Sequence, residues 1–260
     1  MARIFITGSA DGLGQLAARR LIALGHEVVL HGRNRDRAQH ALRAVPGART
    51  ALVGDLASIE ATRALARDAN EAGPFQAVIH NAGVYRPGAE RHETVDGLDD
   101  VFAINALAPY LLTALIEGPQ RLIYLTSGLH QGGDPDLSDL QQRRRGWSGP
   151  QAYANSKLFD VVLAFAVARL LPHVLSNAVA PGWVPTIRVI QESAGLSPAT
   201  PCGSCRLSGS AGRGGLNPNV DRRTGGEDAD NPSLFTLTRG AVTLRCLRPQ
   251  SPVAITDSPA

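Results

Sequence analysis

The sequence predicts a single α/β domain built on an open, doubly wound parallel sheet. Short apolar runs alternate with longer amphipathic stretches from the start of the chain, as in parallel strands joined by crossover helices. Most of these runs are almost continuously apolar, which is typical of strands covered on both faces. A chain of 260 residues is also long enough to bury the core that such a sheet needs.

The apolar runs predict six strands. They are expected at Ile4–Thr7, Glu27–His31, Thr50–Gly54, Ala77–Asn81, Arg121–Thr126 and Val174–Ala180. A doubly wound sheet binds its ligands at the carboxyl ends of its strands. The residues directly after each run are therefore where chemistry is expected.

Four helices are predicted between these strands. In the first, apolar residues recur in steps of three and four and form one stripe, which ends before Gly25, a typical helix stop. The stripe consists of Leu13, Leu16, Ala17, Leu21 and Leu24. The other helices are expected at Ser58–Ala72, with Ser58 as N-cap, at Asp96–Glu117 and at Gln151–Leu171.

The composition narrows the class of protein. Apolar residues make up 43% and charged residues 19% of the chain, which is ordinary for a soluble domain. The net charge is +3, and the basic residues are scattered apart from Arg143–Arg145, so the charge does not indicate nucleic-acid binding. No apolar run reaches the roughly 20 residues of a membrane span. The strand-like start Arg3–Thr7 lacks the features of a signal peptide, so we expect a cytoplasmic location.

The chain changes character after Thr186. The stretch Gln191–Asp230 is rich in Gly, Pro and Ser and has no aromatic residue, a composition that does not readily bury a core. Weak strand-like alternation returns at Leu234–Thr238 and Ala241–Leu247. We therefore predict a folded domain over residues 1–186 and an atypical tail over 187–260, either disordered or a divergent completion of the same domain.

The three cysteines predict neither a disulfide framework nor a metal site. Their number is odd and low, which argues against a set of disulfides. Cys202 and Cys205 have a Cys-X-X-Cys spacing, but a structural zinc site usually needs four ligands and only Cys246 remains. We interpret the spacing as chance.

A glycine-rich loop follows the first predicted strand and opens the first helix. It runs from Thr7 to Gly14, with Gly8 and Gly12 between. Glycines let the backbone turn tightly and approach a ligand closely, while the helix N-terminus offers free N–H groups to a pyrophosphate. This context predicts a dinucleotide site, the alternative being a tight turn with no ligand.

The end of the second strand indicates which dinucleotide binds. An NAD site usually has an acid here for the ribose 2′-OH, whereas an NADP site uses Arg to meet the 2′-phosphate. Here Gly32 is followed by Arg33, with Arg35 nearby. This favours NADP over NAD, with Arg33 as main phosphate contact and Arg35 as helper. The alternative is that both arginines belong to a solvated loop.

Tyr153 and Lys157 form the main catalytic candidate. Four residues apart on a predicted helix, they share one face. A free phenol has a pKa near 10, and a neighbouring ammonium lowers it toward a useful acid–base range. Lys157 is the only lysine in a chain that otherwise uses Arg. The alternative is an exposed helix pair. At the end of the fifth strand Ser127, with Thr126 as its rival, could hydrogen-bond a substrate carbonyl.

These motifs, in this order, resemble the short-chain dehydrogenase/reductase family over residues 3–186. The resemblance implies a Rossmann-type fold and an NADP-dependent oxidoreductase that passes hydride between nicotinamide and a carbonyl or alcohol. It implies a Ser127–Tyr153–Lys157 site with Asn105 holding a water in the proton relay. Besides Arg33, Tyr153 and Lys157, the implied cofactor contacts are Gly8, Ser9, Asp11, Gly12, Leu13, Gly14, Asp55, Leu56, Asn81, Ala82, Gly83, Pro181, Gly182, Val184 and Thr186.

Two of these residues have plain structural alternatives. Asp55 could cap the following turn instead of contacting the adenine. Asn105, taken alone, would more often bond its own backbone.

The sequence departs from the family in two places. Ser127 and Tyr153 are further apart than in most members, which resembles the retinol-dehydrogenase-like branch. The intervening Gly128–Pro150 could shape a substrate entrance or be a solvated surface excursion. After Thr186 the usual substrate-covering segment is not evident, and its loss would open the site to water.

Two classes of function remain after these observations. The first is an active enzyme for a small carbonyl or alcohol substrate. The second is a regulatory or catalytically defective family member that binds NADP(H) without turnover. In either case the family resemblance implies a homo-oligomer paired through Asp96–Glu117 and Gln151–Leu171.

Overall fold

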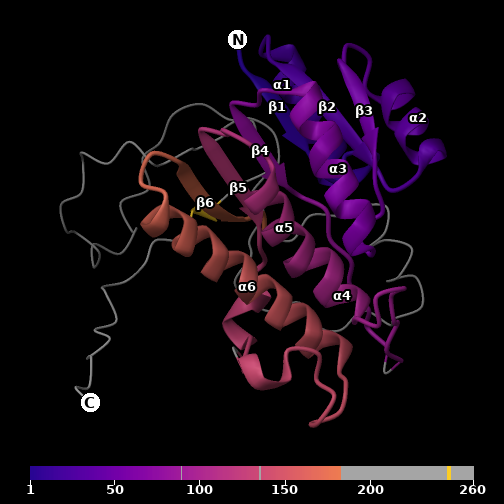
Figure 1. Ribbon diagram of the computed structural model, residues 1–260, viewed down its shortest axis with the longest axis vertical. Coiled ribbons are helices and arrows are strands. Elements are labelled where there is room, and N and C mark those ends of the chain that lie inside the picture. The colour runs from indigo at the N-terminus through magenta and orange to yellow at the C-terminus, as the bar shows by residue number, and fades with distance from the viewer. Residues whose placement is uncertain (89, 135, 183–244, 247–260) are drawn as a thin grey trace, which may run out of the picture.

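The computed structural model describes residues 1–88, 90–134, 136–182 and 245–246, and it confirms the predicted Rossmann-type sheet (Figure 1). The strand order is β3-β2-β1-β4-β5-β6-β7. Six strands are parallel, and β7 (Arg245–Cys246), within the stretch of weak alternation at Ala241–Leu247, pairs antiparallel with β6. The parallel strands are β1 (Arg3–Ile6), β2 (Glu27–Gly32), β3 (Thr50–Val53), β4 (Ala77–His80), β5 (Arg121–Leu125) and β6 (Leu175–Ala180).

The helices cover both faces of this sheet. In Figure 1, α3, α5 and α6 lie side by side in front of the strands. The α-helices are α1 (Gly12–Ala23), α2 (Arg35–Ala44), α3 (Ile59–Ala72), α4 (Asp100–Phe102), α5 (Ala108–Leu115) and α6 (Gly149–Leu170). A π-helical turn, η1 (Ala103–Leu107), joins α4 to α5, and η2 (Gly128–Gly132) and η3 (Leu137–Asp139) are 3-10 turns.

Each face of the sheet has its own hydrophobic core, and β1 contributes to both. Phe5 belongs to the core under α3, α5 and α6, together with Tyr124 and Leu112. Its neighbours Ile4 and Ile6 belong to the core under α1 and α2. Successive side chains of a strand point to opposite faces, so a strand buried on both sides is apolar throughout. This is why the continuous apolar runs predicted the strands well.

The sequence did not predict α2. This helix is polar around most of its surface, and it buries only two side chains, those of Ala38 and Ala41. Its start is set by the N-cap Asn34, whose side chain accepts a hydrogen bond of 2.9 Å from the Arg37 backbone N–H. A helix with so small an apolar face gives no periodic signal.

The prediction of one regular α-helix over Asp96–Glu117 is wrong in two respects. The helix is shorter at both ends, and a π-helical turn interrupts it. The helix begins at Asp100, because the Asp99 carboxylate caps the Phe102 N–H at 3.0 Å. It widens into the π-turn Ala103–Leu107 and ends at Leu115. The predictions of Ser58–Ala72, with Ser58 as N-cap, and of Gln151–Leu171 agree closely with α3 and α6.

Candidate active site

The glycine-rich loop is held in place by His31 at the end of β2. The His31 ring accepts a hydrogen bond from the Gly8 N–H at Nδ1 (2.9 Å), so its Nε2–H donates to the Gly54 carbonyl (2.8 Å). The Ser9 hydroxyl accepts from the His31 N–H (2.8 Å) and donates to the Ile6 carbonyl (3.0 Å). Burial lowers the pKa of His31, which keeps the ring neutral and able to accept. A single His at a strand end gave no signal in the sequence.

The end of β4 holds the same loop from the other side. The Asn81 amide donates to the carbonyls of Thr7 and Gly8, both at 2.9 Å. The Thr7 hydroxyl accepts from the backbone N–H groups of Asn81 (3.0 Å) and Ala82 (3.1 Å). A Cβ on Gly14 would lie 2.5 Å from the Asn81 amide nitrogen, so only glycine fits there. The loop is therefore preformed.

The preformed loop is suited to a pyrophosphate. Helix α1 begins at Gly12. Its first hydrogen bond is donated by the Gln15 N–H to the Asp11 carbonyl. The N–H groups of Gly12 and Leu13 thus belong to the free first turn of a helix, which attracts anions. Asp11 does not cap the helix; its carboxylate pairs with Arg37 instead. The loop residues fit a dinucleotide.

The ribose end of the site lies between β2 and α2. A Cβ on Gly32 would come within 2.4 Å of the Ala38 nitrogen, so the close approach of α2 requires glycine at this strand end. Arg33 is exposed and forms no ion pair with any residue that the structure describes. Arg37 lies one turn into α2, and sequence reasoning missed it because α2 itself was missed. Arg35 begins α2 and is also exposed.

Asp55 and Leu56 follow β3 and have structural contacts. The Asp55 carboxylate accepts the Ala57 N–H at 3.0 Å, the capping contact that we considered as the alternative. The Leu56 side chain is buried in the larger core. Neither side chain is shown against a ligand, so their roles in binding adenine stay predictions.

Helix α6 and strand β5 bring the three catalytic candidates to one end of the sheet. Tyr153 and Lys157 lie on α6, with the Lys157 Nζ 5.8 Å from the centre of the Tyr153 ring. The Tyr153 ring also packs edge-on against Tyr85 at 5.0 Å. Ser127 is the second residue after β5 and is partly exposed. The Thr126 hydroxyl is buried and donates to the Lys157 carbonyl at 2.7 Å, so Thr126 already has a structural role.

Asn105 lies in the π-turn, fully buried. Its amide bonds both backbone groups of Val84, at 2.8 and 2.9 Å, and donates to the Ser156 hydroxyl at 3.0 Å. A Cβ on Gly83 would lie 3.5 Å from the Asn105 Oδ1 and 3.6 Å from the Lys157 Nζ. The Asn-Ala-Gly segment, Asn105 and Lys157 therefore meet, and π-turns are frequent at functional sites.

Lys157 has a second partner that sequence reasoning missed. Its ammonium donates to the Leu125 carbonyl at 2.7 Å and to the Asp160 carboxylate at 2.8 Å. Both side chains of the pair are almost completely buried. The signal that could have revealed Asp160 is an acid one helical turn beyond the lone lysine.

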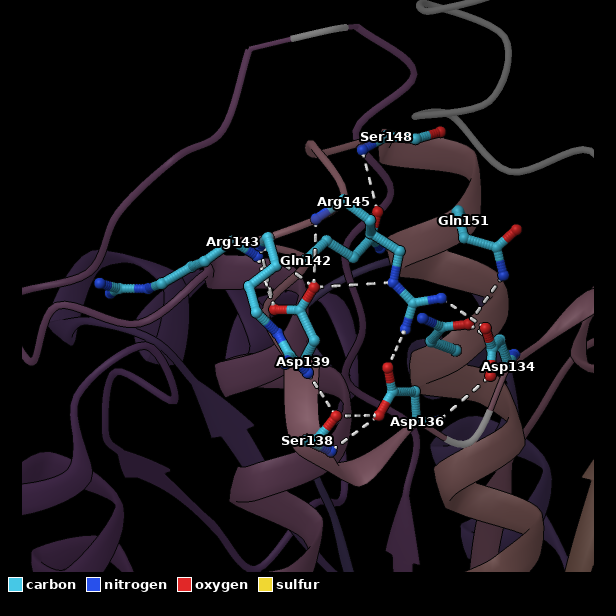
Figure 2. Close-up of polar contacts among 11 residues, drawn as sticks. Asp134, Asp136, Ser138, Asp139, Gln142, Arg143, Arg145, Ser148 and Gln151 are labelled. Atoms are coloured by element: carbon cyan, nitrogen blue, oxygen red, sulfur yellow. Dashed lines mark hydrogen bonds and ion pairs between the residues drawn. The ribbon is translucent and has the colours of Figure 1, made fainter.

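The segment Gly128–Pro150 folds around Arg145. Figure 2 shows the Arg145 guanidinium between three carboxylates, those of Asp134, Asp136 and Asp139. Asp139 also accepts the Arg143 backbone N–H at 2.8 Å. The segment is thus held together by its own ion pairs.

Trp147 ties this segment to the rest of the domain. Its indole N–H donates to Asp99, the residue that caps α4. Gln141 accepts the Asp99 N–H at 3.0 Å and a guanidinium N–H of Arg91 at 2.8 Å. The segment packs as a wall beside the N-terminal turns of α6, where Tyr153 lies.

The last predicted cofactor segment is described in part. Pro181 and Gly182 directly follow β6. Val184, Thr186 and the Cys202–Cys205 pair lie outside the described residues, as does the predicted boundary at residue 186. Within the part of the chain that the structure describes, no helix has the length and apolar character needed to cross a membrane.

Known proteins are similar to this chain in sequence and in fold. A family model described as short chain dehydrogenase matches residues 2–118. An uncharacterized oxidoreductase from Emericella nidulans is 50% identical over 189 residues, covering 72% of this chain and 71% of that protein. Retinol dehydrogenase 14 from Homo sapiens is 30% identical over 210 residues, covering 70% of this chain and 62% of that protein. The crystal structure of a blue fluorescent protein from a metagenomic library, in complex with NADPH, has a TM-score of 0.58 and 26% identity over 72% of this chain and 76% of its own. The chain therefore belongs to the short-chain dehydrogenase family, a family of oxidoreductases, in its retinol-dehydrogenase-like branch.

Proposed function

We propose that this chain is an NADP-dependent oxidoreductase that passes hydride between the nicotinamide and a carbonyl or alcohol substrate. One observation carries the proposal. The only lysine of the chain is buried with its ammonium 5.8 Å from the centre of the Tyr153 ring, beside the end of β5. An ammonium next to a phenol stabilises the phenolate that is left when the proton is given up, which is the role proposed for Lys157 beside Tyr153.

The proposed roles follow from the chemistry of each side chain. In the direction of reduction, the Tyr153 hydroxyl donates its proton to the substrate oxygen while Ser127 hydrogen-bonds the same oxygen and orients the carbonyl. Lys157 stabilises the phenolate that remains. A water held by Asn105 in the proton relay stays a prediction, since both N–H groups of its amide already donate, to Val84 and to Ser156. NADPH, when bound, supplies the hydride to the carbonyl carbon. In alcohol oxidation the Tyr153 phenolate accepts the proton instead.

The preference for NADP over NAD rests on charge at the end of β2. Arg33 is exposed there, next to a glycine where NAD sites usually have an acid. Arg37 adds a second guanidinium on α2, although Asp11 already pairs with it. Arg33 is therefore the proposed contact for the 2′-phosphate, and a family structure with 26% identity binds NADPH.

The substrate is proposed to be a small molecule that enters along the wall formed by Gly128–Pro150. This wall and Tyr153 share the N-terminal end of α6. A cytoplasmic location and pairing of two chains through α5 and α6 stay predictions.

The test combines binding and turnover. Purified protein is titrated with NADPH and with NADH by fluorescence, then assayed with a panel of carbonyl substrates, for the wild type and Tyr153→Phe. We expect tighter binding of NADPH than of NADH, equal NADPH binding by the variant, and a loss of turnover of at least about a hundredfold.

Each of three other results of this test would contradict a different part of the proposal. Tighter NADH binding would contradict the role of Arg33, and full activity of Tyr153→Phe would contradict the role of that hydroxyl. Binding without turnover of any substrate in the wild type would favour a regulatory NADP(H)-binding protein.

A further inference from the structure

Lys157, the residue proposed to act on Tyr153, forms a buried ion pair with Asp160. The two residues lie one turn apart on α6. The side chain of Lys157 is 6% exposed and that of Asp160 is 3% exposed. Lys157 also donates to the Leu125 carbonyl at 2.7 Å, so two of its three N–H donors are used inside the domain. Its position is thus fixed by groups of the protein alone.

Without a counter-ion, this ammonium would not remain charged. Burial disfavours the charged form of a lysine and can lower its pKa to about 5–6. Burial is the largest single influence on Lys157 and lowers its pKa, but the charge of Asp160, the charge of Tyr153 and the hydrogen bond to Asp160 together raise the pKa above its usual value. The charge of the lysine therefore depends on Asp160.

The groups that face Asp160 include no other cation among the described residues. On α6 Asp160 faces Lys157, which in turn lies beside Tyr153. On β5 the buried Tyr124 has its pKa raised, first of all by burial, and stays a neutral phenol. On β4, burial lowers the pKa of His80, which stacks on Tyr124, to about 3, so this ring is neutral too. Lys157 and Asp160 thus depend on each other for their charges.

We propose that Asp160 is a positioning residue of the active site: it keeps the Lys157 ammonium charged and directed toward the end of β5 before any cofactor binds. This inference rests on the proposed function, since it assigns a purpose to the charge that acts on Tyr153. Asp160 touches neither substrate nor cofactor in this role. It acts through Lys157, and it sets the pH range over which Tyr153 has a cation beside it.

The sequence allows a direct test, because Lys157 is the only lysine. Protein grown with lysine labelled at ¹³Cε and ¹⁵Nζ gives a single side-chain resonance, whose pH titration is followed by NMR without cofactor or substrate. In the wild type we expect the ammonium to persist to about pH 10 or above. In Asp160→Asn we expect proton affinity at least about tenfold weaker, a drop in pKa of about one unit or more.

Asp68→Asn is the matched control, because Asp68 is an exposed acid on α3. Its lysine titration should match the wild type. An unchanged Lys157 titration in Asp160→Asn would overturn the proposal. This readout needs neither NADPH binding nor turnover, so a failed NADPH titration would contradict the proposed function without touching the result for Asp160.

A second measurement applies if Asp160→Asn does not fold. Burial, acting against the attraction of Lys157, raises the pKa of Asp160 to about 6. In the wild type the ¹³Cε resonance of Lys157 should therefore move as Asp160 gains its proton at falling pH, and a resonance that does not move at any pH down to acid unfolding would overturn the pairing. Asp160→Glu, which keeps the charge, should restore the ammonium. In turnover, loss of the counter-ion should move the pH profile, whereas a merely structural defect would lower the rate equally at every pH.

Discussion

The glycine-rich loop of the cofactor half and the two buried or half-buried cations of the catalytic half, Lys157 and Arg145, are held in place by different kinds of contact. In the cofactor half, neutral groups make short hydrogen bonds to the main chain: the Asn81 amide bonds the carbonyls of Thr7 and Gly8, and the neutral His31 ring bonds the Gly8 N–H. In the catalytic half the corresponding contacts are ion pairs, Lys157 with Asp160 and Arg145 with three carboxylates.

This difference has a physical consequence. Main-chain hydrogen bonds and close backbone approach fix atoms within a few tenths of an ångström and do not depend on salt. Ion pairs respond to pH and, where they are exposed, to ionic strength. We therefore expect the cofactor half to be sensitive to added volume, and the catalytic half to be sensitive to charge.

The largest effect is expected from Gly14→Ala. The added methyl group would lie 2.5 Å from the Asn81 amide nitrogen and 2.6 Å from the Gly8 carbonyl oxygen. The loop must then shift, and overpacking of this kind costs about 1–3 kcal/mol. We expect NADPH affinity to fall at least about tenfold in a fluorescence titration and the thermal midpoint to fall with it.

Gly132→Ala is the matched control for this prediction. A Cβ at Gly132 meets nothing within 4 Å, so this variant should bind NADPH as the wild type does. Equal NADPH affinity in the two variants would contradict the view that close approach fixes the loop.

The second effect separates the two buried histidines. Both nitrogens of the His31 ring are hydrogen-bonded, whereas the His80 ring has one nitrogen without a partner among the described residues. The pKa of His80, about 3, is below the value of about 6.5 in the unfolded chain. Stability is therefore complete above about pH 6.5 and falls as the pH drops below it, by about 1.4 kcal/mol per unit for each such histidine.

His80→Phe should remove the share of this loss that belongs to His80. Phe retains the stacking on Tyr124, whose ring centre is 4.8 Å away, and leaves no buried nitrogen unpaired. Urea unfolding at pH 7.5 and pH 5.5 should show that the variant loses about 1.4 kcal/mol less than the wild type between these values. Identical losses would mean that His80 does not titrate as described.

The same contrast explains what the sequence could predict. Strands such as Ile4–Thr7 and the loop around Gly8 follow from local patterns, because burial on two faces and tight turns constrain neighbouring residues directly. Asp160 could not be singled out, because an acid one turn from a lysine is more often an exposed pair and nothing in a single helix shows that both are buried. Arg37 was missed together with α2, whose apolar face is only two alanines wide.

The ion pairs within the Gly128–Pro150 segment could not be predicted from the sequence either. Its two alternatives, an entrance wall and a solvated excursion, have the same composition, and that composition does not show which carboxylates reach Arg145. Those carboxylates come from three separate positions between Asp134 and Asp139. Such pairings depend on the path of the backbone, which no periodic pattern encodes.

The smallest effect on global stability is expected from Arg145→Met, although it removes the centre of this wall. The Arg145 side chain is 34% exposed, so solvent screens its pairs and the urea midpoint of unfolding should fall only slightly. Locally the change is larger, because three carboxylates lose their shared cation (Figure 2). Amide hydrogen exchange should therefore rise between Asp136 and Ser148 while the rates in β1 and α1 stay unchanged. Arg143→Met serves as control, since the Arg143 side chain is more exposed and contacts only Glu93 and the Gly97 carbonyl among the described residues, neither of them in this cluster. If both variants exchange alike, charge does not hold the catalytic half in the way that its geometry indicates.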